Sequence, residues 1–234
     1  MKRALDIAEL LRKCVDEYEW KGDSHAHGVY FTDDKGYMLS KVLAARINHT
    51  VSQGGDLFYS FQRLDEEGFP IVKSEYPFQN LITKPKKHFL LFDKPNLSKE
   101  RLHELFEVPF EYSFKIEPKR FIELYEKGTR RERERCAAKF VLEAGQLRVE
   151  IIRTQSRKSR IVHHVTMPIL ACEPTEAEGV FYINAHTILY VIEIFSSKPY
   201  VQLKVGSDRI MVTEGNEPQT AHLEVLISKM RVRS

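Results

Sequence analysis

Two histidines separated by a single residue are the best candidates for metal chemistry. His25 and His27 lie in the segment DSHAH, and in a β-strand this spacing would place both imidazoles on one face, where they could ligate a metal ion. No cluster of cysteines or carboxylates accompanies them, and the adjacent His163 and His164 would point to opposite faces of a strand. We therefore predict no metal site and no cofactor, and keep a metal-dependent enzyme as the least favoured alternative.

Motifs for catalysis are missing from the rest of the sequence. It contains no GxxxxGK[ST], GxGxxG, GxSxG or HExxH motif, which are the arrangements that cradle phosphates, present a nucleophile or bind zinc. The three cysteines, Cys14, Cys136 and Cys172, are an odd number without a CxxC pair, which favours reduced thiols over disulfides. The sequence predicts a protein that is not an enzyme.

Composition and net charge narrow the class of protein further. The 234 residues are 42% hydrophobic and 29% charged, as in a soluble globular protein of one large domain or two of about 115 residues. No apolar run approaches the roughly 18 to 20 residues of a membrane span, and acidic residues follow the N-terminus closely. We expect a cytoplasmic protein with no membrane contact. Because the net charge is only +3, any DNA-binding role must depend on local basic patches.

The first half of the sequence predicts helices and β-strands. Apolar residues at helical spacing predict an amphipathic helix over residues 4–17. Turn signals between apolar runs predict hairpins at residues 29–39 and 57–72, followed by a short strand at 88–92. Asn96 or Ser98 is a suitable N-cap for a helix that ends near Phe106.

The second half has a clearer pattern. Alternation and turn residues predict the order strand, helix, four strands, helix, three strands. Pro118 suits the first turn of the first helix, Ala144 and Gly145 suit a turn between strands, and Asn184 suits the N-cap of the second helix. The expected strands are 112–116, 137–142, 146–154, 160–169, 180–183, 200–205, 209–213 and 222–230.

This order, within about 120 residues, resembles one domain of the DNA sliding clamps, the family of the bacterial DNA polymerase III beta subunit. Residues 116–121 (IEPKRF) resemble the entry to the first helix of a bacterial clamp domain, and residues 181–189 (FYINAHTIL) resemble its passage from a strand into the second helix. Residues 226–232 (LISKMRV) are similar to the family's C-terminal ending. The resemblance implies an α+β fold of antiparallel sheets with two helices over residues 113–234. Another α+β domain of antiparallel sheets could present the same pattern.

Residues 1–112 match the family less well. We expect an N-terminal α+β domain there, which is either a divergent clamp-like domain or an unrelated addition. Since rings of this family contain six domains, two clamp domains per chain would imply a homo-oligomer of three chains.

The resemblance also implies which residues meet a partner. Clamps surround double-stranded DNA with helices whose basic residues contact phosphates without reading bases. The DNA-facing candidates are Lys119, Arg120, Lys127, Arg130 and Arg131, together with Lys2, Arg3, Arg12 and Lys13 of the N-terminal helix. The alternative is a solvated surface, because Glu132 and Glu134 alternate with the nearby arginines. The second helix of the domain contains no lysine or arginine, a departure from the family pattern.

A second implied site would bind peptide motifs of a polymerase or a clamp loader. Clamps bind such apolar motifs in a groove near the end of the chain, to which Met230 and Val232 correspond. Met230 could instead simply end a strand that faces the core. The sequence thus predicts a clamp-like DNA-tethering or polymerase processivity factor in DNA replication. A nucleic-acid-binding or replication-initiation protein of another fold is the alternative.

Overall fold

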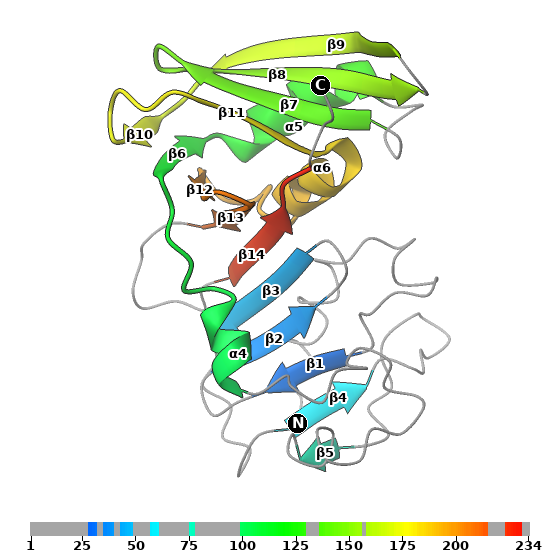
Figure 1. Cartoon of the computed structure of the whole chain (residues 1–234), viewed down its shortest axis with the longest axis vertical. Helices are drawn as coiled ribbons and strands as arrows, with labels where there is room; N and C mark the ends of the chain where they lie inside the picture. The colour runs from blue at the N-terminus through cyan, green and yellow to red at the C-terminus, as the bar shows by residue number, and fades with distance from the viewer. Residues whose placement is uncertain are drawn as a thin grey trace. The chain divides into compact units, whose positions relative to one another are not determined.

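The computed structural model describes residues 28–31, 35–39, 43–48, 57–60, 75–77, 99–129, 136–155, 158–214 and 223–230. The chain divides into two compact units (Figure 1). The first unit comprises residues 1–108 and 217–225, and the second comprises 109–216 and 226–234. The predicted helix at 4–17, the pair His25 and His27, and the predicted strand at 88–92 lie outside the described residues. In the part that is described, no helix is long and apolar enough to cross a membrane.

Antiparallel strands and one short helix, α4 (Lys99–Glu104), make up the described part of the first unit. The strands are β1 (Gly28–Phe31), β2 (Lys35–Leu39), β3 (Leu43–Asn48), β4 (Leu57–Ser60) and β5 (Glu75–Pro77). Their order in the sheet is β3-β2-β1-β4-β5, and β14 (Leu223–Ser228), whose first residues belong to this unit, lies next to β3.

The sequence-based predictions for the first unit succeeded in part. Pairing of Tyr30 with Tyr37 and of Phe31 with Gly36 confirms the first hairpin, and α4 falls within the predicted helix. The predicted partner of β4, residues 69–72, lies outside the described residues, and the two neighbours of β4 are β1 and β5. Strand β3 was not predicted.

The second unit has the predicted order of elements, with one addition. Its elements are β6 (Tyr112–Ile116), α5 (Pro118–Thr129), β7 (Cys136–Glu143), β8 (Gln146–Gln155), β9 (Lys158–Pro168), β10 (Ala171–Glu173), β11 (Gly179–Asn184), α6 (Ala185–Ile194), β12 (Val201–Val205), β13 (Arg209–Thr213) and the end of β14. The three-residue β10 is the addition. One sheet has the order β11-β7-β8-β9, and the other strands are arranged as β10-β6-β12-β13-β14.

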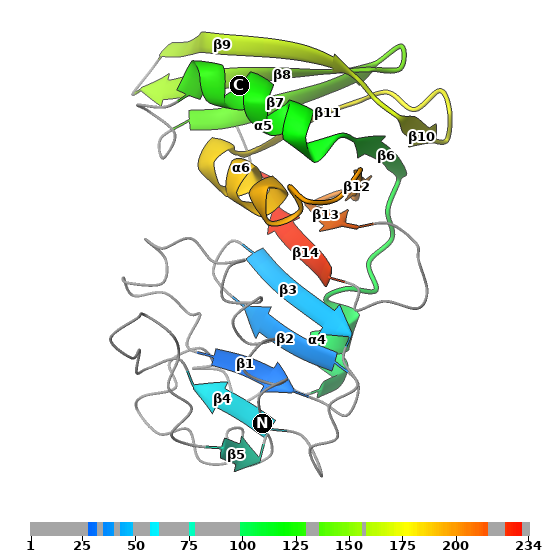
Figure 2. The same cartoon turned by 180° about the vertical axis from the view of Figure 1, so that it is seen from behind.

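Aromatic rings fill the space between the four-stranded sheet and its helices. Phe121 lies 5.1 Å from Tyr125 and 6.2 Å from Phe140, and Phe140 lies 4.9 Å from Phe181, measured between ring centroids. All four side chains are almost completely buried. Helix α5 packs on β9, and α6 packs on β7 and β11, so both helices cover one face of the sheet (Figure 1, Figure 2). Burial of these rings is a major source of stability, since each removes a large apolar area from water.

Local signals fix the start of α6 and the turn before β8. The Oδ1 atom of Asn184 accepts hydrogen bonds from the backbone N–H groups of His186 and Thr187, both at 3.0 Å, as predicted for an N-cap. Ala144 and Gly145 have φ values of 49° and 72°, which form the predicted turn between β7 and β8. Glycine adopts this left-handed conformation without the steric cost that alanine meets.

Candidate nucleic-acid interface

Helix α5 presents two exposed basic residues in its first turn. Pro118, Phe121 and Tyr125 are buried, and this spacing leaves Lys119 and Arg120 exposed to solvent. Neither forms an ion pair with another described residue. Cations are disfavoured at the positive end of a helix, so helix stability does not account for their position. The two charges add to the helix dipole and produce a local positive potential that attracts anions such as phosphate.

The other basic residues predicted to face DNA can be placed only in part. The backbone of Lys127 lies within α5. Arg130 and Arg131 are outside the described residues, and so is the set Lys2, Arg3, Arg12 and Lys13. Lys119 and Arg120 are therefore the two predicted DNA-facing residues whose side chains the structure describes.

Helix α6 lies beside α5 but carries no basic charge. Most of its residues are buried, and it has no acidic residue in its first turn and no basic residue in its last. Its outward positions are occupied by the half-buried His186 and Tyr190 and the exposed Glu193. The positive charge of the two-helix surface is therefore concentrated on α5, as the sequence indicated.

A second group of arginines lies at one end of β8 and β9. Arg153 is half-buried and stands directly opposite the exposed Arg160 in the antiparallel register. Like charges in directly opposed positions are destabilising, but Arg153 also has a further interaction within the structure, so this pair does not by itself indicate a binding site.

The segment after β14 lies along β11. The N–H of Met230 donates to the carbonyl oxygen of Tyr182 at 2.8 Å, and the N–H of Lys229 donates to the carbonyl oxygen of Asp208 at 2.9 Å. Met230 is half-buried and lies two residues beyond the end of the strand. Val232 lies outside the described residues.

Lys229 has unusual surroundings for a lysine near the chain's end. Its Nζ atom lies 5.6 Å from the centroid of the buried Phe181 ring. Burial lowers the pKa of Lys229, although the charges of Glu111 and Asp208 act in the opposite direction. The exposed Val180 and half-buried Tyr182 share the outward face of β11. Apolar side chains therefore accompany Met230 along this strand.

Comparison with known proteins was informative at the level of structure. No protein-family model and no curated protein sequence matches the chain. The beta clamp of Helicobacter pylori has a TM-score of 0.62 at 9% identity, with 98% of this chain and 64% of that chain covered. The DNA polymerase III beta subunit of Pseudomonas aeruginosa has a TM-score of 0.56 at 9% identity, covering 89% and 58%.

An archaeal clamp is similar as well. A chain of the PCNA2–PCNA3 complex of Sulfolobus tokodaii has a TM-score of 0.54 at 13% identity, with 95% of this chain and 94% of that chain covered. This chain has the sliding-clamp fold. The predicted α+β class, antiparallel sheets with two helices, is thereby confirmed. The chain spans 64% of the length of the H. pylori beta clamp.

Sequence reasoning missed a buried charge with two carboxylate partners in the described first unit. Arg46, in β3, is 7% exposed and contacts two glutamates that are distant in sequence. Its only local signal is a basic residue within the apolar segment LAARIN. Among the described residues, no group of three or more histidines, cysteines or carboxylates could hold a metal ion.

Proposed function

We propose that the protein is a non-enzymatic, clamp-like factor that tethers a polymerase or another partner to double-stranded DNA during replication. The observation that carries the proposal is the structural similarity to the beta clamp of H. pylori, which extends over 98% of this chain. This extent also supports the interpretation of residues 1–112 as a divergent clamp-like domain. As a replication factor, the protein would act in the cytoplasm.

Helix α5 would supply the described part of the DNA contact. Lys119 and Arg120 are exposed and can approach phosphates, while α6 offers no lysine or arginine. A contact of so few charges is weak, independent of base sequence and easily disrupted by salt. Such binding suits a protein that is retained on DNA by enclosure and must move along it.

Assembly into a ring would need an accessible strand edge, and β9 provides one. This strand has 11 residues, and β8 is its one neighbour in the four-stranded sheet. Ile161 and Val162 on β9 are 53% and 39% exposed. Long edges with exposed apolar residues are generally covered in native proteins, because they otherwise pair with other chains. We infer that a second copy covers β9 and that three two-domain chains form the ring.

The C-terminal segment would receive partner peptides. Met230 is hydrogen-bonded to Tyr182 of β11, the strand that also carries the exposed Val180, and Val232 follows it by two residues in the sequence. Methionine adapts its shape to apolar ligands, which suits a site for short motifs of a polymerase or a clamp loader.

Retention on circular DNA tests the tethering function. The protein is incubated with its loading partners and a nicked circular plasmid, and bound protein is separated by gel filtration before and after the plasmid is cut once. A clamp remains on the circle in moderate salt and is lost when the DNA becomes linear. Equal retention on both forms, or preference for one sequence, would contradict the proposal and favour a nucleic-acid-binding or replication-initiation protein.

A further inference from the structure

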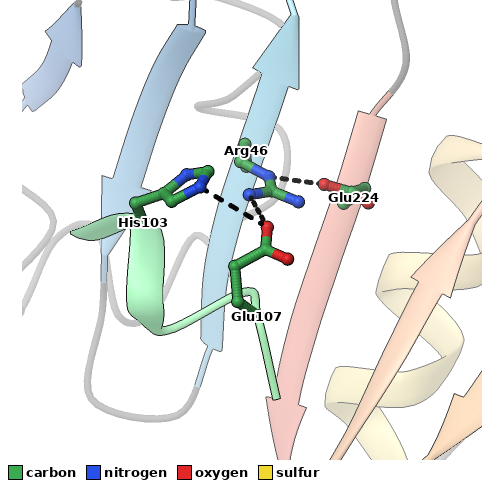
Figure 3. A network of polar contacts seen from close by, with 4 residues as sticks. All are labelled: Arg46, His103, Glu107 and Glu224. Carbon is green, nitrogen blue, oxygen red and sulfur yellow. Dashed lines mark hydrogen bonds and ion pairs between the residues drawn. The ribbon is translucent and has the colours of Figure 1, made fainter. Parts of the chain in front are cut away.

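A buried arginine in the first unit is held by two carboxylates. The Nε atom of Arg46 donates to Oε2 of Glu224 at 2.5 Å, and its Nη1 atom donates to Oε1 of Glu107 at 3.0 Å (Figure 3). The guanidinium carbon also lies 4.6 Å from the centroid of the Phe106 ring. A buried charge is costly unless it is paired and hydrogen-bonded, so all three contacts help to keep this charge inside the unit.

Glu107 and Glu224 lie beside points where the chain passes from the first unit to the second. The chain passes from the first unit to the second between Val108 and Pro109, and again between Val225 and Leu226. Glu107 and Glu224 each stand one residue before the last residue of the first unit at these two crossings. The guanidinium of Arg46 therefore contacts the polypeptide beside two of the three places where it leaves or enters the first unit, and at the second of them it adds to the backbone pairing of β14 with β3.

Neighbouring side chains reinforce the first of these attachments. Phe106 is 3% exposed and packs against Tyr37 of β2, with 5.9 Å between ring centroids. The Nε2 atom of His103 lies 3.8 Å from Oε1 of Glu107, the same oxygen that accepts the hydrogen bond from Arg46 (Figure 3). The segment that ends α4 is thus attached to β2 and β3 by an aromatic contact and by charge.

We propose that Arg46 is a positioning residue that tethers both chain crossings to β3 of the first unit. Removing its fork weakens the attachment at residues 105–111 and at 223–228 together, whereas removing either glutamate weakens only its own crossing. This inference concerns the way in which the chain is held and does not depend on DNA binding.

The two attachments differ in exposure, which predicts unequal strength. The side chain of Glu107 is 56% exposed, whereas that of Glu224 is 13% exposed. Water competes with an exposed ion pair and weakens it, while a shielded pair keeps more of its attraction. The crossing after Glu107 is therefore the one that opens more readily.

Amide hydrogen exchange on the full chain tests the tether. In Glu107→Gln, peptides covering 105–111 should exchange several-fold faster, and in Glu224→Gln, peptides covering 223–228 should exchange about tenfold faster, because the shielded hydrogen bond to a charged group is the stronger of the two. In Arg46→Met both sets should accelerate. Peptides from β7 and β8 should be unchanged in every variant.

Glu150 offers a matched control in the second unit. This carboxylate lies 3.3 Å from Lys139 Nζ and 3.3 Å from Arg148 Nε, so Glu150→Gln removes a carboxylate with two basic partners far along the chain from either crossing. It should leave exchange at 105–111 and 223–228 unchanged. Uniform acceleration throughout Arg46→Met, or acceleration at only one crossing, would overturn the tether. If Arg46→Met does not fold, the two glutamate variants decide, and unchanged exchange in both contradicts the proposal.

Discussion

Tyr125 of α5 donates a hydrogen bond from its hydroxyl group to the carbonyl oxygen of Ala185, the first residue of α6, at 2.8 Å. Both residues are completely buried. The contact joins the two helices of the second unit where α6 begins, next to the N-cap formed by Asn184. It joins α5, which exposes Lys119 and Arg120, to α6, which contains no lysine or arginine.

Replacing Tyr125 with phenylalanine should destabilise the second unit without altering its fold. The ring keeps its stacking with Phe121, but the carbonyl group of Ala185 loses a buried donor. We expect a loss of about 1–2 kcal/mol in the free energy of unfolding, measured in urea. The half-exposed Tyr182 provides a control, since Tyr182→Phe should cost less than about 0.5 kcal/mol. Equal effects of the two changes would show that the hydrogen bond between the helices is not important for stability.

Much of the second unit follows from local sequence, for identifiable reasons. Strands β8, β9 and β11 alternate buried residues with more exposed ones over most of their length, and single residues such as Asn184 and Gly145 act on the backbone beside them. Strand β3 escaped prediction because Arg46 occupies a buried position. The partners of Arg46 are 61 and 178 residues away in sequence, so no local pattern reveals that its charge is compensated.

The candidate interface was predictable only in outline. Exposure of Lys119 and Arg120 follows from the helical spacing of Phe121 and Tyr125, which the sequence shows. The attachment of Met230 to Tyr182 depends on where β14 ends relative to β11, and this relationship is set by tertiary packing. Local periodicity therefore indicates which residues are outward-facing, but it does not indicate which segments they meet.

Substituting Lys119 and Arg120 in the first turn of α5 should weaken binding to double-stranded DNA and reduce its dependence on salt. Each phosphate contact contributes about 0.9 to the slope of log K against log salt concentration. Lys119→Gln combined with Arg120→Gln should therefore lower that slope by about 1–2, as measured by fluorescence anisotropy with a short duplex. Lys139→Gln removes a lysine that is paired with Glu150 on the sheet and should leave the slope unchanged. An unchanged slope in the double variant would exclude Lys119 and Arg120 from the DNA contact.

Charged residues on the edge of β9 should prevent assembly. If three chains form a ring, light scattering at micromolar concentration should give three times the chain mass of 27.3 kDa. Ile161→Lys combined with Val162→Lys should reduce the mass to that of one chain, because lysine on an edge strand opposes pairing with another strand. Val180→Lys alters a similarly exposed valine on β11 and should not change the mass. A single-chain mass for the unsubstituted protein would contradict the ring.

Acid should weaken the attachment between Arg46 and Glu107. The hydrogen bond from Arg46 holds the pKa of Glu107 below its ordinary value of 4.5. A lowered pKa in the folded state means that this carboxylate stabilises the fold fully above pH 4.5 and loses that contribution as the pH falls through the lower value. Because Glu107 is largely exposed, its contribution is about 0.2–1 kcal/mol.

Comparison with Glu107→Gln isolates this effect. At pH 6 the unsubstituted protein should exceed the variant in free energy of unfolding, and the difference should disappear as the pH falls below 4.5, because protonated glutamate and glutamine are both neutral. In Arg46→Met the carboxylate of Glu107 has lost its cationic partner. Adding Glu107→Gln to that variant should therefore no longer lower the free energy of unfolding at pH 6. Urea unfolding at a series of pH values measures all four proteins. A difference that persists at low pH would show that Glu107 contributes through packing and not through its charge.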